Sequence, residues 1–341
     1  MKRQLMTGLF AALAFTAVAQ SNEWRDPEVN AVNRAPMHAN FFAYETAEVA
    51  AKDAKEQSQN FMTLNGPWKF FWVKNADARP TDFWRTDYND KGWNNMPVPG
   101  VWELNGYGDP LYVNVGYAWR EQFKNNPPEV PTVNNHVGSY RREIMVPASW
   151  NGKEIIAHFG SVTSNMYLWV NGKYVGYSED SKLEAEFNLT PYLKPGQKNL
   201  IAFQVFRWCD GTYLEDQDKF RMTGIFRDVY LLKRPEAVLY DYFTTTKLLG
   251  SAAEVEICAK FLGNAAETVN IRIQDMDGNT VAAGGFKETA EGEYSHKAVF
   301  TIMEPKLWNP ETPYLYQVVF ETEGEVITDR IGLREVKRDG S

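Results

Sequence analysis

Residues 166–177 read MYLWVNGKYVGY, and this short stretch indicates what kind of fold the chain adopts. Two runs rich in aromatic and β-branched residues, MYLWV and KYVGY, flank the pair Asn171-Gly172. A two-residue type I′ turn requires positive φ at both central positions, which asparagine and glycine tolerate best. The stretch therefore predicts a tight β-hairpin.

The period-two pattern of half-buried strands continues on both sides of this hairpin. Segments with this character are PWKFFWVK (67–74), SYRREIMVP (139–147), KEIIAHFG (153–160), NLIAFQVFRW (199–208) and DVYLLK (228–233). Only residues 45–57, which contain TAEVAAKDAKEQ, are rich in helix formers and predict a short surface helix. We predict a β-sandwich over residues 60–234, preceded by an extended segment over residues 20–59.

A second group of strands begins after Lys233-Arg234-Pro235, because proline cannot continue a central strand. Its candidate strands are AEVEICAKF (253–261), ETVNIRIQD (267–275), EYSHKAVFTI (293–302), YLYQVVFET (314–322) and EVITDRIGL (325–333). Short strands and regular turns within roughly 100 residues are typical of an immunoglobulin-like sandwich. The predicted fold class is therefore all-β, with this second sandwich over residues 235–338.

Composition narrows the class of protein. A chain of 341 residues exceeds the usual size of one domain, which agrees with two sandwiches. The net charge of −8 argues against a nucleic-acid partner, because phosphate neutralisation needs clustered Lys and Arg. Aromatic residues make up 14% of the chain and suit either sandwich cores or surfaces that stack on sugars.

The N-terminus has the three parts of a secretory signal. Lys2 and Arg3 precede an apolar run over residues 5–15, and Ala17-Val18-Ala19 supplies small residues for cleavage. The apolar run is too short to span a bilayer as a helix. We expect a signal peptide over residues 1–19, no membrane span, and an exported, periplasmic protein.

Cysteine and histidine point to no catalytic or metal motif of their own. Cys209 and Cys258 fall in different predicted domains, so we expect two buried free thiols rather than a disulfide. The four histidines are widely scattered, which gives little support to a histidine metal site or a catalytic triad. His158 lies within a strand pattern and is interpreted as structural.

One loop concentrates carboxylates among aromatic residues. It reads RWCDGTYLEDQDKFRMTGIFRDVYL (207–231) and lies between two predicted strands, hence at one end of a sandwich. From the residues alone two readings stay open. The carboxylates are either solvated or paired with Arg221 and Arg227, or they form a polar site for a hydroxylated ligand or a hard cation.

This loop resembles the matching stretch of the glycoside hydrolase family 2 β-galactosidases. The resemblance extends over most of the chain, including LNGPWKFFW, PVPGVWELNGYGDPLYVNVGYAW, NPPEVPTVNNHVGSYRREIMVP, LWVNGKYVGYSEDSKLEAEFNLTPYL, PKLWNPETPYLY and IGLREV. The sequence departs from the family pattern at residues 116–119 (GYAW) and 135–137 (NHV), which puts the shape of the nearby subsite in question.

The resemblance implies a jelly-roll sugar-binding domain, an immunoglobulin-like domain and then a TIM barrel. In this family the barrel carries two catalytic Glu that cleave terminal β-D-galactose with retention. The chain ends where the barrel is expected to begin, so the resemblance places no catalytic residue within it. We expect the noncatalytic N-terminal portion of a β-galactosidase, whose partners are a β-galactoside, a barrel and further copies in an oligomer.

The resemblance also implies binding residues. Asn114 corresponds to a contact with the galactosyl group, and Asp218 to a residue that bonds the sugar O6 hydroxyl and ligates sodium. A second cation site, for magnesium, corresponds to Glu23, Asp26, Glu179 and Asp210 with the Val29 carbonyl. These side chains are more acidic than is usual for the family, which favours a divalent ion or adds repulsion without one.

Two alternatives remain beside this expectation. The chain could be a stand-alone carbohydrate-binding module that uses exposed Trp and Tyr for stacking, or a scaffold that helps to hold an oligomer together. A reading frame that continues past Ser341 into a barrel with two catalytic Glu would favour the enzyme portion over both.

Overall fold

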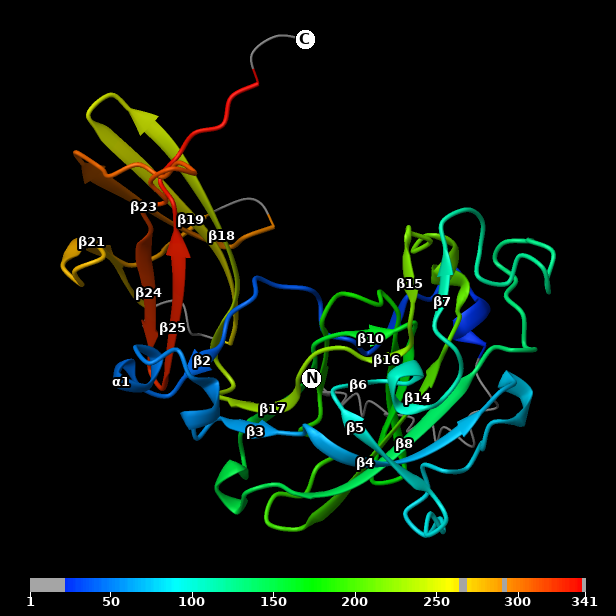
Figure 1. The fold of residues 1–341 in the computed structure, drawn as a ribbon. Coiled ribbons are helices and arrows are strands. Elements are labelled where there is room, and N and C mark those ends of the chain that lie inside the picture. The colour runs from blue at the N-terminus through cyan, green and yellow to red at the C-terminus, as the bar shows by residue number, and fades with distance from the viewer. Residues whose placement is uncertain (1–21, 264–268, 290–292, 339–341) are drawn as a thin grey trace, which may run out of the picture.

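The computed structural model describes residues 22–263, 269–289 and 293–338, which fold into two β-sandwiches (Figure 1). The all-β fold class is confirmed, with 45% of residues in strands and 7% in helices. The predicted signal peptide over residues 1–19 lies outside the described residues. No helix among the described residues is long and apolar enough to cross a membrane.

The first sandwich consists of two sheets that face each other. The larger sheet has the order β1 (Ala31–Val32), β12 (Lys173–Ser178), β11 (Met166–Val170), β14 (Lys198–Phe206), β8 (Val137–Met145), β4 (Gly66–Val73), β5 (Asn94–Val98). The smaller sheet has the order β13 (Ala185–Asn188), β9 (Glu154–Phe159), β17 (Val229–Arg234), β3 (Phe61–Thr63). A small sheet of β10 (Val162–Thr163), β16 (Gly224–Ile225) and β6 (Gly100–Val101) lies beside them.

Aromatic side chains fill the space between these two sheets. Trp68 and Phe203 from the larger sheet are both fully buried, with ring centroids 4.9 Å apart. Phe159 from the smaller sheet contacts Phe203 at 5.7 Å and Phe187 at 6.4 Å, in both cases edge to face. Burying each such side chain contributes about 1.5–3 kcal/mol to folding. The alternation seen in the sequence therefore directs these rings into one core.

The predicted hairpin at residues 166–177 is confirmed. Val170 of β11 pairs with Lys173 of β12, and the two turn residues, Asn171 and Gly172, have φ of 51° and 80°. The Asn171 amide donates to the Tyr192 carbonyl at 2.9 Å, and its oxygen accepts from the Leu200 amide at 2.9 Å. The turn residue thus ties the hairpin to the neighbouring strand as well as reversing the chain.

The second sandwich pairs a four-stranded with a five-stranded sheet. Their orders are β18 (Val238–Leu249), β19 (Ala252–Leu262), β23 (His296–Met303), β22 (Lys287–Glu288), and β2 (Ala43–Tyr44), β25 (Glu325–Ile331), β24 (Tyr316–Thr322), β20 (Asn270–Gln274), β21 (Thr280–Gly284). Its core includes Val255, Ile257, Phe300 and Phe320. Alternate residues along β19 are buried, as the sequence pattern predicts.

Buried polar contacts join the two sandwiches. β17 ends at Arg234 and β18 begins at Val238, so the ladder stops around Pro235. Arg234 donates Nε to Glu325 Oε1 at 2.9 Å and Nη2 to Glu325 Oε2 at 2.8 Å, with both side chains buried. Burial removes these charges from water, and the two-point contact compensates for that loss.

The segment before the first sandwich contributes a strand to each sandwich. β1 pairs with β12 in the first, and β2 pairs with β25 in the second. Figure 1 shows this segment in blue running between the two domains. The chain therefore visits both sandwiches before it completes either of them.

His38, in the same segment, anchors the chain to the first sandwich. It contacts Glu186 at 3.0 Å, and His158 contacts the other oxygen of Glu186 at 2.8 Å. Burial by itself would raise the pKa of Glu186, but the hydrogen bonds from the two histidines outweigh it and lower that pKa to about 2. The structural interpretation of His158 is thus confirmed.

The predicted helix over residues 45–57 is mostly wrong. Only α1 (Ala47–Ala50) forms, capped by the Thr46 side chain, because Asp53 adopts a φ of 49° that ends helical geometry. The other helical pieces are 3₁₀ turns: η1 (Glu23–Arg25), η2 (Lys55–Gln57), η3 (Ala76–Ala78), η4 (Glu103–Asn105), η5 (Ala148–Trp150) and η6 (Asp210–Tyr213). Helix propensity here yields to tertiary contacts, such as the bond from Ser58 to Glu45 at 2.5 Å.

Both cysteines are free thiols, as predicted. Cys209 is buried, but Cys258 is only partly buried because its side chain lies on the outer face of β19.

Candidate functional site

A two-stranded ribbon at one end of the first sandwich brings Asn114 and Asp218 together. β7 (Leu111–Val113) pairs antiparallel with β15 (Lys219–Arg221), and Val113 lies opposite Lys219 (Figure 1). The same register, continued by one residue, sets Asn114 opposite Asp218. Both residues are exposed. Asn114 and Asp218 therefore each lie one residue beyond the last pair of this ladder, at an accessible edge.

Aromatic rings flank this pair. The Tyr112 hydroxyl donates to Asp218 Oδ1 at 2.6 Å, and this hydrogen bond raises the pKa of Tyr112. The rings of Tyr112 and Phe220 lie 5.5 Å apart, and both side chains are exposed. Carboxylate and amide groups bond sugar hydroxyls, while ring faces cover the apolar faces of a sugar. The ribbon therefore combines both kinds of group that a sugar subsite needs.

Each of the two interpretations of the acidic loop applies to different carboxylates of that loop. Asp216 forms an ion pair with Arg221, Glu215 accepts from the Ser181 amide at 2.8 Å, and Asp228 pairs with Lys55 at 2.7 Å. These three carboxylates are structural. Asp218 and Asp210 have no cationic partner within ion-pair distance among the described residues, so they alone remain candidates for a ligand.

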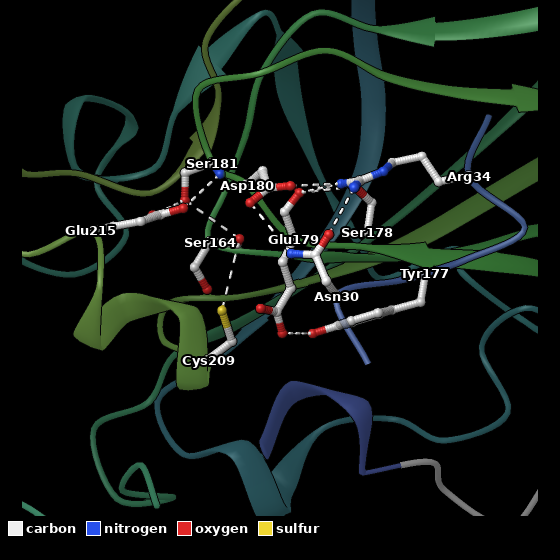
Figure 2. A network of polar contacts seen from close by, with 10 residues as sticks. All are labelled: Asn30, Arg34, Ser164, Tyr177, Ser178, Glu179, Asp180, Ser181, Cys209 and Glu215. Carbon is white, nitrogen blue, oxygen red and sulfur yellow. Dashed lines mark hydrogen bonds and ion pairs between the residues drawn. The ribbon is translucent and has the colours of Figure 1, made fainter. Parts of the chain in front are cut away.

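A buried cluster surrounds Asp210. Ligand atoms of Glu179, Cys209 and Asp210 all lie within 4.8 Å of one another, and all three residues are buried. The Tyr177 hydroxyl donates to Glu179 Oε1 (Figure 2), whereas Asp210 Oδ1 is buried with no hydrogen-bond partner. A buried carboxylate oxygen without a partner is costly, so this atom requires a proton or a cation.

The loop that carries Glu179 is fixed from both sides, as Figure 2 shows. Arg34 donates to the Ser178 hydroxyl at 3.0 Å, to the Glu179 carbonyl at 3.1 Å and to Asp180 Oδ2 at 3.1 Å. On the other side Ser181 donates to Glu215. These contacts fix the backbone on both sides of Glu179.

Burial and mutual repulsion change the acidity of the pair. Burial, reinforced by the charge of Asp210, raises the pKa of Glu179 to about 8, although the Tyr177 hydrogen bond opposes this rise. Burial also raises the pKa of Asp210, and Asp26 adds to that effect. Without a cation the Glu179–Asp210 pair therefore retains a proton near neutral pH. A bound cation would displace that proton.

The donor set suits a hard cation, which prefers carboxylate oxygens. Among the other predicted ligands, Glu23 accepts from the Tyr167 hydroxyl at 3.1 Å and Asp26 accepts from the Glu28 amide at 3.2 Å. η1 packs against η6, but neither residue belongs to the buried cluster of the described chain. The roles of Glu23, Asp26 and the Val29 carbonyl therefore stay predictions.

Sequence reasoning did not identify Cys209 and Tyr177 as members of the cluster. Tyr177 precedes Glu179 by two residues on a strand, and Cys209 directly precedes Asp210. Period-two spacing could have indicated Tyr177, because residues two apart share a strand face.

The described residues form two tandem β-sandwiches, the first with an amide, a carboxylate and aromatic rings exposed at one edge, so the molecule is a modular all-β protein. Family models agree: "Glycosyl hydrolases family 2, sugar binding domain" matches residues 61–235, and "Glycosyl hydrolases family 2" matches residues 237–334. The chain belongs to glycosyl hydrolase family 2. It corresponds to the N-terminal domains of the members of that family.

The relatives that match the chain at 36–37% identity include β-galactosidases. The chain is 36% identical to the enzyme of Priestia megaterium over 87% of this chain, and 37% identical to that of Yersinia pestis (strain Pestoides F) over 94%. These matches cover 30% and 31% of the relatives' own lengths. The chain therefore spans about a third of these relatives, and no (β/α)₈ barrel lies within its described residues.

Solved structures share the fold at lower identity. A β-glucuronidase from Ruminococcus gnavus matches with a TM-score of 0.59 at 19% identity, over 82% of this chain and 44% of that one. The Lactobacillus rhamnosus β-glucuronidase matches with a TM-score of 0.60 at 21% identity, over 82% and 45%. At this identity the likeness supports the fold alone.

Proposed function

We propose that the chain is the noncatalytic N-terminal portion of an exported, periplasmic β-galactosidase, which hydrolyses terminal β-D-galactose residues with retention. The Tyr112–Asp218 hydrogen bond, on the ribbon that leads to Asn114, carries this proposal. The named relatives, all β-galactosidases at 36–37% identity, support the substrate class. The catalytic barrel and the oligomer belong to the longer protein.

In this proposal the ribbon completes the galactose site of the barrel. Asn114 contacts the galactosyl group, and Asp218 accepts from the O6 hydroxyl and ligates sodium. The Tyr112 hydrogen bond occupies Oδ1 of Asp218 and leaves Oδ2 for the ligand. An ionised carboxylate accepts only, which suits both a hydroxyl donor and a hard cation.

The buried cluster serves as the magnesium site in the same proposal. Glu179 and Asp210 would hold the ion, with Glu23, Asp26 and the Val29 carbonyl completing its shell from the adjoining η1 region. When bound, the ion supplies positive charge to a buried acidic pair. Asp210 begins η6 and Asp218 directly precedes β15, so an ion held at Asp210 would lie near the start of the segment that leads to Asp218.

The test uses the longer protein encoded when the reading frame is followed past Ser341. Asp218→Asn should lower kcat/KM by roughly ten-fold or more and weaken the response to sodium, because a charged hydrogen bond and an anionic ligand are lost. Asp82→Asn removes the same charge from an exposed residue elsewhere and should leave both unchanged. Wild-type kinetics and sodium response in Asp218→Asn, or a frame without a barrel, would refute the proposal.

A further inference from the structure

A cavity that is lined by strand β7 together with Arg207, Trp208 and His136 is assigned no ligand in the function proposed above. Its volume is about 470 Å³, within the range of about 300–1,000 Å³ that is usual for small-molecule sites. Lys74, Arg120 and Arg207 contribute cations to its lining, and His136 and Trp208 also line it. Residues 116–119 and 135–137, where the sequence departs from the family pattern, supply Ala118 and His136.

Arg207 is the most informative of these residues. Its side chain is half-buried and stacks on Trp208 with the guanidinium carbon 4.6 Å from the ring centroid. Its Nε is buried without a hydrogen-bond partner, and no carboxylate of the described residues forms an ion pair with it. Asp109 and Glu121 also line the cavity without pairing with it. Burial lowers the pKa of Arg207 while the charges of Glu103 and Asp109 act to raise it, and the unpartnered Nε leaves a donor that an anion can engage.

The surroundings of His136 show that several positive charges lie close to this cavity. It is only 5% exposed, Nδ1 has no partner, and its ring lies against Gly108, where a Cβ would come within 2.9 Å. Burial, together with the charges of Arg207 and Lys74, lowers the pKa of His136 to about 3. The imidazole is therefore neutral and can donate a single hydrogen bond, while the fixed cations supply the positive field.

We propose that this cavity binds the oxyanion group of a charged sugar, a sulfate ester or a carboxylate, with Arg207 as its principal partner. Arg207 presents a planar set of donors that fits such groups at two points, and Trp208 holds the guanidinium in place. Lys74 and Arg120 lie at the exposed mouth and attract the anion. Leu111, Tyr112 and Val113 line the cavity as well, so the ligand reaches the strand that leads to Asn114.

Calorimetric titration of the 341-residue chain tests this proposal. Galactose 6-sulfate and galacturonate distinguish a sulfate ester from a carboxylate, and neutral galactose is the comparison ligand. At least one charged sugar should bind about ten-fold or more tightly than galactose. Arg207→Gln should weaken that binding by about ten-fold or more, as expected for the loss of a charge-assisted hydrogen bond.

Two further variants make the outcome decisive. Lys74→Gln changes an exposed residue and should weaken binding several-fold even if Arg207→Gln does not fold. Arg85→Gln removes an exposed arginine that pairs with Asp87 and should leave affinity within about two-fold. The proposal fails if galactose binds as tightly as both charged sugars, if neither charged sugar binds, or if Lys74→Gln and a folded Arg207→Gln leave affinity unchanged.

This result is separable from the galactosidase proposal. Asp218→Asn in the same chain should preserve binding of the charged sugar, because Asp218 does not line the cavity. Loss of anion binding in Asp218→Asn would mean that the charged sugar binds at the ribbon instead, which overturns the cavity assignment.

Discussion

Glu179 and Asp210 bring two acidic groups together in a place from which water is largely excluded. Tyr177 satisfies one oxygen of Glu179, while Asp210 Oδ1 has no partner. The raised pKa of Glu179, about 8, makes this pair a source of pH-dependent stability. Because its folded pKa lies above the unfolded value of 4.5, the stability associated with the bound proton is complete below about pH 4.5 and is lost as pH rises through 8.

Glu179→Gln should therefore increase the free energy of unfolding at pH 7.5 by about 1–2 kcal/mol in EDTA, with little change at pH 4.5. Glutamine reproduces the protonated acid and removes the cost of ionisation. Urea unfolding at the two pH values measures the effect, and the exposed Glu28→Gln is the control. Equal effects of Glu179→Gln at both pH values would contradict the prediction.

Magnesium should raise the Tm of wild type more than the Tm of the Glu179→Gln variant. In wild type at pH 7.5, millimolar magnesium should raise Tm, because the ion replaces the shared proton and binds only the folded state. Glu179→Gln should lose most of that rise. Thermal melts with magnesium and with EDTA provide the measurement, and an equal rise in both proteins would exclude Glu179 as a ligand.

Single residues were only partly predictable as site members. Asn114 and Asp218 could be named from the sequence because the resemblance covers their motifs, and the β7–β15 register then explains how they meet. Arg207 could not be recognised as unpaired, since pairing depends on which distant carboxylates the fold brings near. Cys209 was expected only to be a buried thiol, and its proximity to Glu179 results from tertiary packing.

At the scale of elements, local chemistry determines the turns more firmly than the helices. Asn171-Gly172 supplies both positive φ values of the predicted hairpin, so sequence and structure agree. Residues 45–57 have helix-forming composition, yet α1 ends after one turn. Helix propensity differences are small per residue, and contacts such as Tyr44 to Asp53 at 3.3 Å suffice to override them.

Gly172→Ala tests the importance of this turn. A Cβ at Gly172 would meet only ordinary contacts, at 3.8 Å and beyond, so the cost arises from its φ of +80°. We expect a loss of about 1–2 kcal/mol in the free energy of unfolding. Gly92→Ala, with open space around its Cβ and no positive φ, should change it by less than about 0.5 kcal/mol. Urea unfolding that shows equal effects would assign the hairpin's stability to other contacts.

At the scale of the whole molecule, Arg234 and Glu325 connect the end of one sandwich to the edge of the other. Their side chains are 8% and 0% exposed, so removing one charge leaves its partner buried and unpaired. This differs from the partly exposed pair Arg272–Glu321 within the second sandwich. Sequence could not predict this contact, because Glu325 lies far along the chain from Arg234.

Glu325→Gln should lower the free energy of unfolding by about 3–5 kcal/mol, the usual cost of breaking a buried ion pair. Glu321→Gln makes the same chemical change in the partly exposed pair and should cost less than about 1 kcal/mol. Urea unfolding of both variants compares them directly. A small effect of Glu325→Gln would show that the pair is not important for joining the domains.

The 341-residue chain should show no turnover of a chromogenic galactoside. Retaining cleavage needs two carboxyl groups about 5 Å apart that flank the bond, and the resemblance assigns both to the barrel. Activity that persists through purification and elutes with the chain would place catalytic groups within it.

The pairing of β2 with β25 has a consequence for how the protein is made. During synthesis, Ala43–Tyr44 have no partner strand until Glu325–Ile331 have been made. The five-stranded sheet of the second sandwich therefore forms completely only after residue 331 has been made. A fragment that begins at residue 236 would lack β2. The backbone N–H and C=O groups on that edge of β25 would then be unpaired, and other copies could pair with them. The second sandwich therefore depends on a strand that the chain makes before the first sandwich is complete.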